Sequence, residues 1–409
     1  MLEKTASDKS ATDVVGMSLT EEFLAKCYEF RRNVLSDKYE MREAADPSAE
    51  GTDATVDEKP WRTVTRESIN TMARRMKREL GKECGSKSFV EEYIYSEETP
   101  DYDPIAAYFN QLPAWDGKDR VRDLFLRLPE VSEVQIAQLS VWLRSCVAHW
   151  LHIDHLHGNE QIFTLIGPQG SGKSTYCAQL LPEPLRVYYL DHVNLANKFD
   201  KDMALTNNLL VNIDELDQIK AGKQPELKQL VSKIIVNGRP IFGKAQRERL
   251  RYASFVATTN NPRPLQDKTG SRRYLCVQIP QDTIICNDRP IDYEQLFAQV
   301  LYEVCEQKLP YWFTPAETRQ IEEQNVKFQH IDDLESMLNA CFRRPEAEEI
   351  VHPLMTSEVV GILANSYPDM KVTAGMNVKV GRLLSAMNFE RKVVAKGTVY
   401  YIVPMKKSA

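Results

Sequence analysis

The most informative part of this sequence is the segment QIFTLIGPQGSGKSTYCAQLL, residues 161–181. Its apolar start predicts a strand, the motif GxxxxGK[ST] runs from Gly167 to Ser174, and a helix-forming stretch follows. Glycines let the backbone curl so that successive N–H groups point at phosphate oxygens, and the following helix adds positive charge at its start. The order of strand, glycine-rich loop and helix therefore predicts a phosphate-binding loop in an α/β domain.

Each part of this loop has an expected task in binding a nucleotide. Lys173 is expected to bridge the β- and γ-phosphates, and the Ser174 hydroxyl to bind Mg²⁺. ATP and Mg²⁺ are therefore the expected cofactors, while a loop that is purely structural is the alternative. The residues expected to hold the nucleotide are Gly167, Gly170, Ser171, Gly172, Lys173, Ser174 and Thr175.

Around this loop, residues 161–280 alternate strand-like and helix-like stretches, and this alternation predicts a mainly parallel sheet. The apolar run LLVNIDE, residues 209–215, is typical of a strand buried on both faces. It ends in two acids: we expect Asp214 to bind Mg²⁺ and Glu215 to polarise the attacking water. A further strand at 255–259 ends in Asn260, which we expect to contact the γ-phosphate. A polar residue that only ends a strand is the alternative.

Two basic segments complete the expected site. Arg272 and Arg273 precede the strand-like YLCVQI, and an arginine lent by a neighbouring subunit stabilises charge in the transition state. Such a finger implies a homo-oligomeric ring; we favour Arg272, and a salt-bridged loop pair is the alternative. Residues 238–251, GRPIFGKAQRERLR, resemble a protruding basic hairpin that contacts single-stranded DNA, with a solvated loop as the alternative. The residues expected to contact DNA are Phe242, Lys244, Arg247 and Arg249.

The flanking regions show weaker patterns. Residues 1–17 are expected to be a frayed terminus, residues 31–42 a hairpin around Ser36-Asp37, and residues 44–59 a flexible acidic loop. A basic amphipathic helix is expected at 65–80, more often a solvated face than a DNA-binding one, and a long helix at 135–157.

The C-terminal block, about 354–404, predicts two helices followed by two strands around Lys396-Gly397. This is the order of a winged helix, which reads duplex DNA in some proteins and only packs against protein in others.

Composition narrows the class of protein. The 409 residues suggest about two to three domains. The net charge of −6 lies entirely in the first 60 residues, so a polyanion site would have to be a local basic patch. The eight cysteines include no CxxC pair and read as thiols of a reducing compartment. Neither a membrane span nor an export signal is recognisable, so a cytoplasmic protein is expected.

The combined motifs resemble the AAA+ ATPase core of superfamily 3 helicases and of poxvirus-type primase-helicases. More narrowly, the chain is similar to the virulence-associated protein E family of phages and mobile elements. The resemblance covers about residues 28–315 and rests on YEFRRNVLSDKYEMR, LPAWDGKDRV, GPQGSGKST, NLLVNIDELDQI, ASFVATTNNPRPL and TGSRRYL. It implies ATP-dependent DNA unwinding or replication initiation, whereas the first 100 residues show no primase triad.

This resemblance implies an α/β fold with an AAA+ P-loop core, a helical N-terminal region and a C-terminal winged-helix-like domain. The expected divisions are an α+β region at 1–100, a helical collar at 101–160, the ATPase core at 161–290, a helical segment at 291–345 and the winged-helix-like domain at 346–409.

Several alternatives stay open. The chain could be an ATP-switched DNA-binding regulator or initiator adaptor without processive unwinding. A small-molecule kinase is disfavoured because it leaves Asn260, the arginine pair and the basic hairpin without a task. The histidines at 149–157 could bind a metal, but the pattern favours the end of a helix followed by a turn. The Tyr188-Tyr189 and Tyr400-Tyr401 pairs are expected to pack within strands and not to stack on bases.

Overall fold

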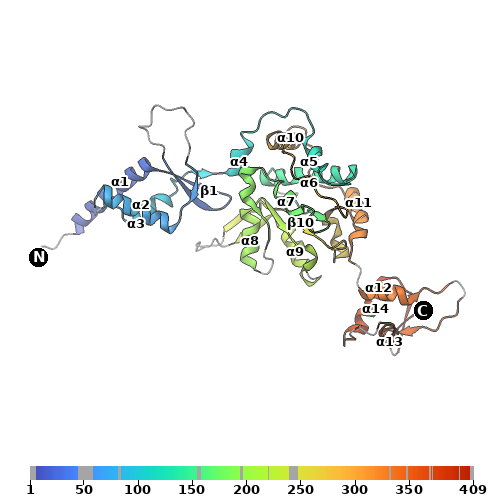
Figure 1. The fold of residues 1–409 in the computed structure, drawn as a ribbon. Coiled ribbons are helices and arrows are strands. Elements are labelled where there is room, and N and C mark those ends of the chain that lie inside the picture. Colours follow the sequence, from blue (N-terminus) through green and yellow to red (C-terminus); the bar gives the residue numbers. More distant parts are fainter. Residues whose placement is uncertain are drawn as a thin grey trace. The chain divides into compact units, whose positions relative to one another are not determined.

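The computed structural model divides the chain into two compact units, residues 1–328 and 329–409, and each is described by itself (Figure 1). The structure describes residues 6–44, 59–81, 84–153, 158–193, 197–219, 221–238, 247–330, 333–346, 349–367, 370, 372–395 and 397–405.

A five-stranded sheet, parallel throughout, forms the centre of the first unit. Its strand order is β11-β5-β10-β7-β6, so the strand before the phosphate loop lies inside the sheet. The expected α/β domain with a parallel sheet is confirmed. The strands are β5 (Ile162–Ile166), β6 (Tyr189–Leu190), β7 (Leu210–Ile213), β10 (Ser254–Thr259) and β11 (Tyr274–Gln278).

Alternation along the strands supplies two hydrophobic clusters, one on each face of the sheet. On β5, Phe163 and Leu165 join one cluster, whereas Ile162 and Ile166 join the other. All residues of β5, β7 and β10 are buried, as expected for a parallel sheet covered on both faces.

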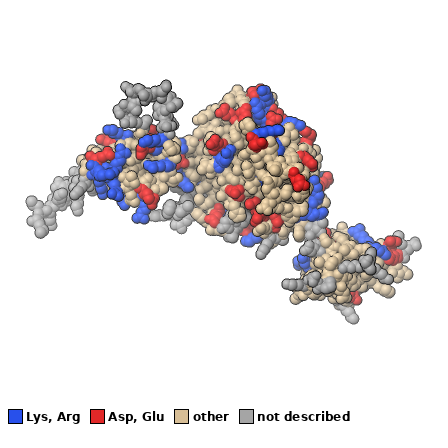
Figure 2. All heavy atoms as spheres, viewed as in Figure 1, with Lys and Arg blue, Asp and Glu red and all other residues tan. Residues whose placement is uncertain are grey.

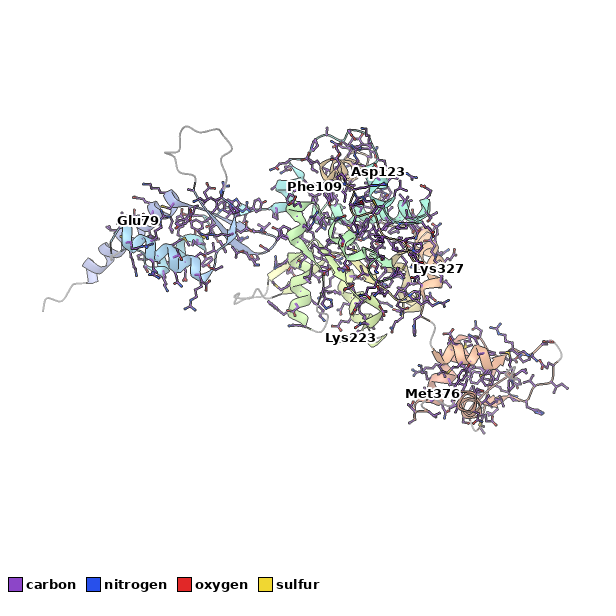
Figure 3. The ribbon with its side chains drawn as sticks, in the orientation of Figure 1. Glu79, Phe109, Asp123, Lys223, Lys327 and Met376 are labelled. Carbon is purple, nitrogen blue, oxygen red and sulfur yellow. The ribbon has the colours of Figure 1, made fainter. Side chains whose placement is uncertain are left out.

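Helices cover both faces. The first cluster takes in α6, α7 and α10, and the second takes in α8 and α9. Figure 3 labels Phe109 of α4, which is buried in the first cluster. The α-helices are α4 (Pro104–Phe109), α5 (Arg120–Phe125), α6 (Glu133–Trp150), α7 (Lys173–Ala178), α8 (Lys198–Asn207), α9 (Gln224–Ser232), α10 (Tyr293–Cys305) and α11 (Pro315–Asn325). Short 3₁₀ turns lie at Glu183–Tyr188, Leu216–Gln218, Ala221–Lys223, Lys268–Arg273 and Val326–Phe328.

The long helix α6 corrects one expectation. It begins after a Ser132–Gln135 capping box and ends at Trp150, not at residue 157. His152 then adopts a left-handed backbone with φ of 50°, which cannot continue the helix. The apolar pattern alone did not reveal this stop.

The N-terminal region combines helices with a mixed sheet of order β3-β2-β1-β4, so it is α+β rather than helical. The strand pair at Ser36-Asp37 and the helix capped by Thr65 are confirmed. The frayed start is wrong from Ala6 onward, where α1 begins; residues 45–58 of the acidic loop lie outside the described residues. The elements are α1 (Ala6–Cys27), β1 (Tyr28–Asn33), β2 (Lys38–Glu43), β3 (Arg62–Thr63), α2 (Arg66–Glu79), α3 (Lys87–Ile94) and β4 (Asp101–Tyr102).

The basic hairpin is present as two antiparallel strands, β8 (Ile235–Gly238) and β9 (Arg247–Leu250). Its expected tip, with Phe242 and Lys244, lies outside the described residues. In the face that Figure 2 shows, basic and acidic side chains of the first unit are interspersed.

The second unit has its own hydrophobic cluster, which α12 shares with α13 and α14. Because α12 packs here, the unit begins before the expected boundary at residue 346. The predicted two helices and strand pair are confirmed; the winged-helix assignment stays a prediction. The elements are α12 (Asp333–Cys341), β12 (Phe342–Arg343), β13 (Leu354–Met355), α13 (Thr356–Ser366), α14 (Met376–Ala386), β14 (Arg391–Val394), β15 (Gly397–Tyr400) and β16 (Val403–Pro404).

Candidate active site

A pocket of about 620 Å³ opens at the carboxyl ends of three adjacent strands, β5, β10 and β7. Open α/β sheets bind ligands at this edge because the loops that follow parallel strands converge there. The pocket is lined by Gln169, Gly170, Gly172, Lys173, Ser174, Thr175, Asp214, Glu215, Asp217, Gln218, Thr258, Thr259 and Asn260. The structure thus brings together all but Gly167, Ser171 and the arginines of the expected nucleotide and catalytic residues.

The glycines of the loop are required by geometry. Gly170 and Gly172 have φ of 79° and 83°, which side chains with a Cβ rarely adopt. At Gly167 a Cβ would lie 2.7 Å from the Cβ of Ile279. The loop is closed by the Ser171 hydroxyl, which donates to the Pro168 carbonyl at 2.9 Å. The backbone therefore adopts a tight curl between β5 and α7.

Lys173 lies folded against this loop. Its Nζ donates to the carbonyl oxygens of Gly167 (2.9 Å) and Pro168 (2.7 Å), and to Oδ1 of Asn260 (3.0 Å). The residue is 8% exposed, and burial lowers the pKa of its ammonium group while Asp214 acts in the opposite direction. Lys173 and Asn260, 87 residues apart in sequence, thus meet at the pocket.

The acids follow β7 as expected. Asp214 accepts a hydrogen bond from the Thr258 hydroxyl, so one carboxylate oxygen is oriented by the neighbouring strand. Glu215 is exposed and has a left-handed backbone with φ of 53°. Non-glycine residues held in this region are strained and concentrate at functional sites.

Among the pocket residues that were missed from the sequence, two threonines orient two acids. The Thr259 hydroxyl donates to Asp217 at 2.5 Å, and the Thr258 hydroxyl donates to Asp214. The sequence contains a sign of these contacts, because two successive threonines end a strand whose preceding residues are apolar. These bonds join the end of β10 to the segment that follows β7.

The residues present fit a divalent cation with oxygen ligands. Ser174 and Asp214 line the same pocket, and Mg²⁺ in nucleotide sites needs only one or two protein oxygens beside phosphate and water. No cluster of three or more histidine, cysteine or carboxylate groups suited to a metal occurs in the part of the chain that the structure describes. Ser174 and Asp214 therefore stay the predicted ligands.

The two arginines differ in environment. Arg273 pairs with Glu160 at 3.5 Å, and its side chain is 14% exposed. Arg272 is exposed, and within the described ranges its side chain takes part in no hydrogen bond or ion pair. Of the pair, Arg272 is therefore the more exposed residue, and which arginine is the finger stays a prediction.

Of the expected DNA contacts, Arg249 is engaged inside the chain. Its guanidinium donates to Thr206 Oγ1 (3.0 Å), Asn207 Oδ1 (2.8 Å) and the Leu35 carbonyl (3.0 Å), which corrects its expected orientation toward DNA. At this position of β9 the side chain points toward the protein. A run of basic residues in the sequence does not indicate that direction. Phe242, Lys244 and the Arg247 side chain lie outside what the structure describes.

The tyrosine pairs that were weighed as base-stacking groups are represented by two buried side chains. Tyr188 is buried and accepts a hydrogen bond from Asn33, and Tyr400 is buried in the cluster of the second unit. His155 and His157 lie outside the described residues. All eight cysteines are free thiols, five of them buried.

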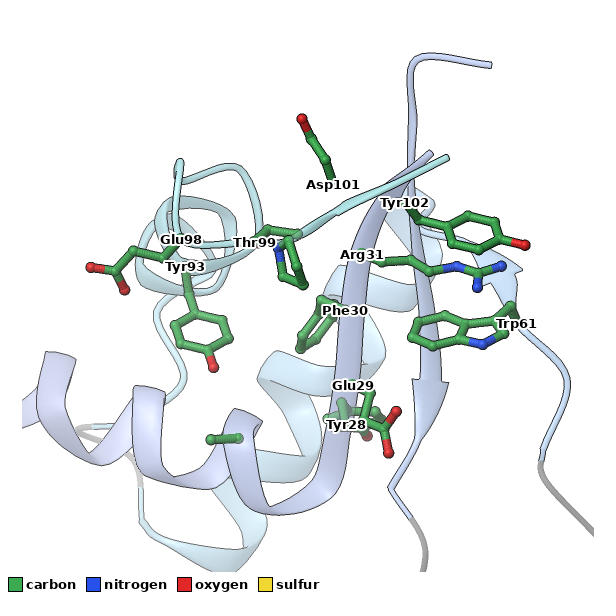
Figure 4. Close-up of a pocket in the computed structure, with 12 residues that line it drawn as sticks. Tyr28, Glu29, Phe30, Arg31, Trp61, Tyr93, Glu98, Thr99, Asp101 and Tyr102 are labelled. Atoms are coloured by element: carbon green, nitrogen blue, oxygen red, sulfur yellow. The ribbon is translucent and has the colours of Figure 1, made fainter. Parts of the chain in front are cut away.

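A second pocket, of about 610 Å³, lies in the N-terminal region (Figure 4). The Arg31 guanidinium is stacked between two aromatic rings: its Cζ lies 4.1 Å from the ring centroid of Trp61 and 3.4 Å from that of Tyr102. Its Nε also pairs with Oε2 of Glu40 at 2.7 Å. Glu29, another lining residue, pairs with Arg42. Since these charges are matched within the chain, we assign this pocket no role in phosphate chemistry.

The family model for the virulence-associated protein E-like domain matches residues 109–330, more than half of the chain. The chain belongs to this family. The match includes the phosphate loop, both acids, Asn260 and the arginine pair. No curated protein matches the chain.

Solved structures similar to this chain include two that are named as helicases. The apo NrS-1 C-terminal region has a TM-score of 0.47 at 13% identity, covering 95% of this chain and 99% of that one. The active helicase Cch of SCCmec type IV has a TM-score of 0.35 at 10% identity, covering 92% of each chain. JCV helicase has a TM-score of 0.24 at 13% identity, covering 78% and 71%. Among the described residues, no helix has the length and apolarity to cross a membrane.

Proposed function

We propose that this protein is a Mg²⁺-dependent ATPase of a phage or mobile genetic element that acts on DNA during replication, as an unwinding motor or initiator. One observation carries the proposal: Lys173, Asp214 and Asn260, which follow three separate strands of the sheet, line one pocket at a glycine-rich loop. Family membership supports it, since the matched segment contains the whole pocket.

The pocket residues divide the work of hydrolysis. Lys173 leaves the loop carbonyls to contact the β- and γ-phosphates, and Glu215 orients and polarises the attacking water. Asn260, whose Oδ1 accepts a hydrogen bond from Lys173 in this structure, contacts the γ-phosphate of the nucleotide. Bound Mg²⁺, held by Ser174 and Asp214, supplies charge neutralisation on the phosphates.

The exposed Arg272 supports an assembled form. An arginine with its guanidinium in solvent can enter the pocket of a neighbouring copy, and such fingers raise turnover by about 10³–10⁵-fold. We therefore propose an AAA+ homo-oligomeric ring in which Arg272, not Arg273, completes the site of the next subunit.

Two surfaces are proposed for DNA. The segment between β8 and β9, which contains Phe242 and Lys244, is proposed to contact single-stranded DNA together with Arg247 at the start of β9. The second unit is proposed to be a winged helix that binds a duplex, because cations on a helix and an adjacent strand suit its phosphates. The exposed cations of α14 and β14 are Lys379, Arg382, Arg391 and Lys392.

Replacing Lys173 by alanine tests the ATPase. We expect ATP turnover to fall at least about 10²-fold, since the cation that neutralises the transferred phosphate is lost. Phosphate release with Mg²⁺ and single-stranded DNA is the measurement, and Lys223→Ala, at an exposed turn, is the control. Equal turnover in wild type and Lys173→Ala would remove the pocket from the proposal.

The second candidate is an ATP-switched DNA-binding regulator without processive unwinding. It is favoured by the separate compact second unit, whose helix and strand order suits duplex binding. A strand-displacement assay on a forked duplex separates the two: ATP-dependent displacement supports the motor, and duplex binding that depends on ATP without displacement supports the regulator.

A further inference from the structure

The segment that follows β11 packs against the phosphate loop from outside the pocket. The Ile285 N–H donates to the Ser171 carbonyl at 3.0 Å, and Nδ2 of Asn287 donates to the Gly172 carbonyl at 2.9 Å. Two successive carbonyls of the loop are thus held by a segment more than 100 residues away in sequence.

Asn287 and Gly172 fit closely. A Cβ at Gly172 would lie 2.5 Å from Nδ2 of Asn287, so the amide occupies the space that any other residue would need. The Gly172 carbonyl also accepts the first helical bond of α7, from the Tyr176 N–H at 3.0 Å. Its two lone pairs are therefore both used, and its direction is set from two sides.

The segment itself is anchored. The Cys286 N–H donates to the Arg127 carbonyl at 3.3 Å, and the Arg127 guanidinium, on a residue 7% exposed, donates to the carbonyls of Arg289 and Pro290. In addition, Nε2 of Gln179 donates to the Asn287 carbonyl at 3.1 Å. Asn287 therefore approaches the loop from a braced position on both sides.

The direction of these carbonyls matters because a peptide unit is planar and trans. Its N–H points opposite to its C=O, so holding the Gly172 carbonyl outward turns the Lys173 N–H the other way, toward the pocket. Holding the Ser171 carbonyl does the same for the Gly172 N–H. These are N–H groups of the kind by which such loops bind phosphate.

We propose that Asn287 is a positioning residue that orients the Lys173 N–H for nucleotide phosphate. This inference rests on the proposed function. The Asn287 carboxamide oxygen is buried and accepts no hydrogen bond among the residues the structure describes, so only the donor half of the amide is used. A leucine, similar in shape, would therefore remove the bond to Gly172 and little else.

The test compares Asn287→Leu with Asn110→Leu, the same change at the exposed end of α4. We expect Asn287→Leu to raise the KM for ATP about fivefold to tenfold while kcat changes less than about threefold, because the loop contacts ground state and transition state alike. The control should change neither constant. Binding of a fluorescent ADP analogue, measured in parallel, should weaken by the same factor.

The outcomes are separable. A folded Asn287→Leu with unchanged ADP binding and KM overturns the positioning role and leaves the ATPase standing. Binding without hydrolysis in wild type overturns the ATPase, while the ADP measurement still decides Asn287. If Asn287→Leu does not fold, Asn287→Asp replaces the donor by an acceptor; loss of fold in both variants, or no nucleotide binding by wild type, overturns the inference.

Discussion

At the phosphate loop and at the base of the basic hairpin, a buried basic side chain donates hydrogen bonds to backbone carbonyls. At the phosphate loop this side chain can bind a ligand, whereas at the hairpin base it only stabilises the fold. Lys173 donates to two carbonyls and Asn260 at the wall of an open pocket. Arg251, fully buried, donates to the carbonyls of Asn159, Val231, Lys233 and Ala253 and stacks 5.1 Å from the Phe255 ring.

Access to solvent distinguishes the side chain that can bind a ligand, Lys173, from the one that serves the structure, Arg251. Burial lowers the pKa of both side chains, to about 9 for Arg251, and neither donates to a carboxylate. Lys173 can exchange its carbonyls for phosphate because the pocket is open beside it. Arg251 binds carbonyls in three segments of the core, where no solvent can replace its guanidinium, so this side chain stabilises the fold.

The largest expected effect separates these two cations. Arg251→Met leaves four buried carbonyls without their donor and should lower the free energy of unfolding by about 3 kcal/mol or more. Lys173→Met should change it by less than about 1 kcal/mol, because water in the pocket replaces the ammonium. Urea unfolding followed by tryptophan fluorescence measures both, since all five tryptophans lie in the first unit. Equal losses would break the distinction.

An intermediate effect on the free energy of unfolding is expected at the arginine pair. Arg273→Ala removes the ion pair with Glu160 and should lower the free energy of unfolding by about 1 kcal/mol, whereas Arg272→Ala should leave it unchanged. In turnover the order reverses: Arg272→Ala should lose about 10³-fold. Unfolding and phosphate release, measured on both variants, check this; a larger turnover loss in Arg273→Ala would assign the finger to that residue.

The smallest effect is expected where solvent screens the charges. In the second unit Arg343 pairs with Glu349 through two hydrogen bonds of 2.8 and 2.9 Å, which are the largest cause that lowers the pKa of Glu349 from 4.5 to about 2. A carboxyl with a lowered folded pKa stabilises above pH 4.5 and loses that contribution as pH falls toward 2. Glu349→Gln should therefore be slightly less stable than wild type at about pH 7, and the difference should shrink as pH falls through about 2.

Amide hydrogen exchange in residues 333–405 measures this difference within the second unit. A difference that persists at the acid end of this range would show that Glu349 acts through packing instead of charge.

Much of the candidate site could be predicted because its parts are local. The strand before Gly167, the loop and α7 are contiguous, the two acids follow β7, and Asn260 follows β10. The parallel sheet then brings those ends together with no further information. The family resemblance, carried by the same segments, is confirmed by the match over residues 109–330.

Other features depend on contacts between distant segments. The Arg273–Glu160 pair, the Thr259–Asp217 bond and the Asn287 contact with Gly172 join residues 113, 42 and 115 apart. Arg249 was expected on a DNA-facing surface, yet the protein uses it to join Thr206, Asn207 and Leu35. Residue type and spacing cannot indicate which way such a side chain turns.

The amino-acid order by itself determined the phosphate loop, the acidic strand end and the alternation of strands and helices, because propensity, glycine geometry and burial patterns act over a few residues. Only the tertiary structure decided which arginine is exposed, which threonines orient the acids and which amide holds Gly172. Those contacts depend on strand order and on the path of the chain after β11, which come from packing of the whole unit.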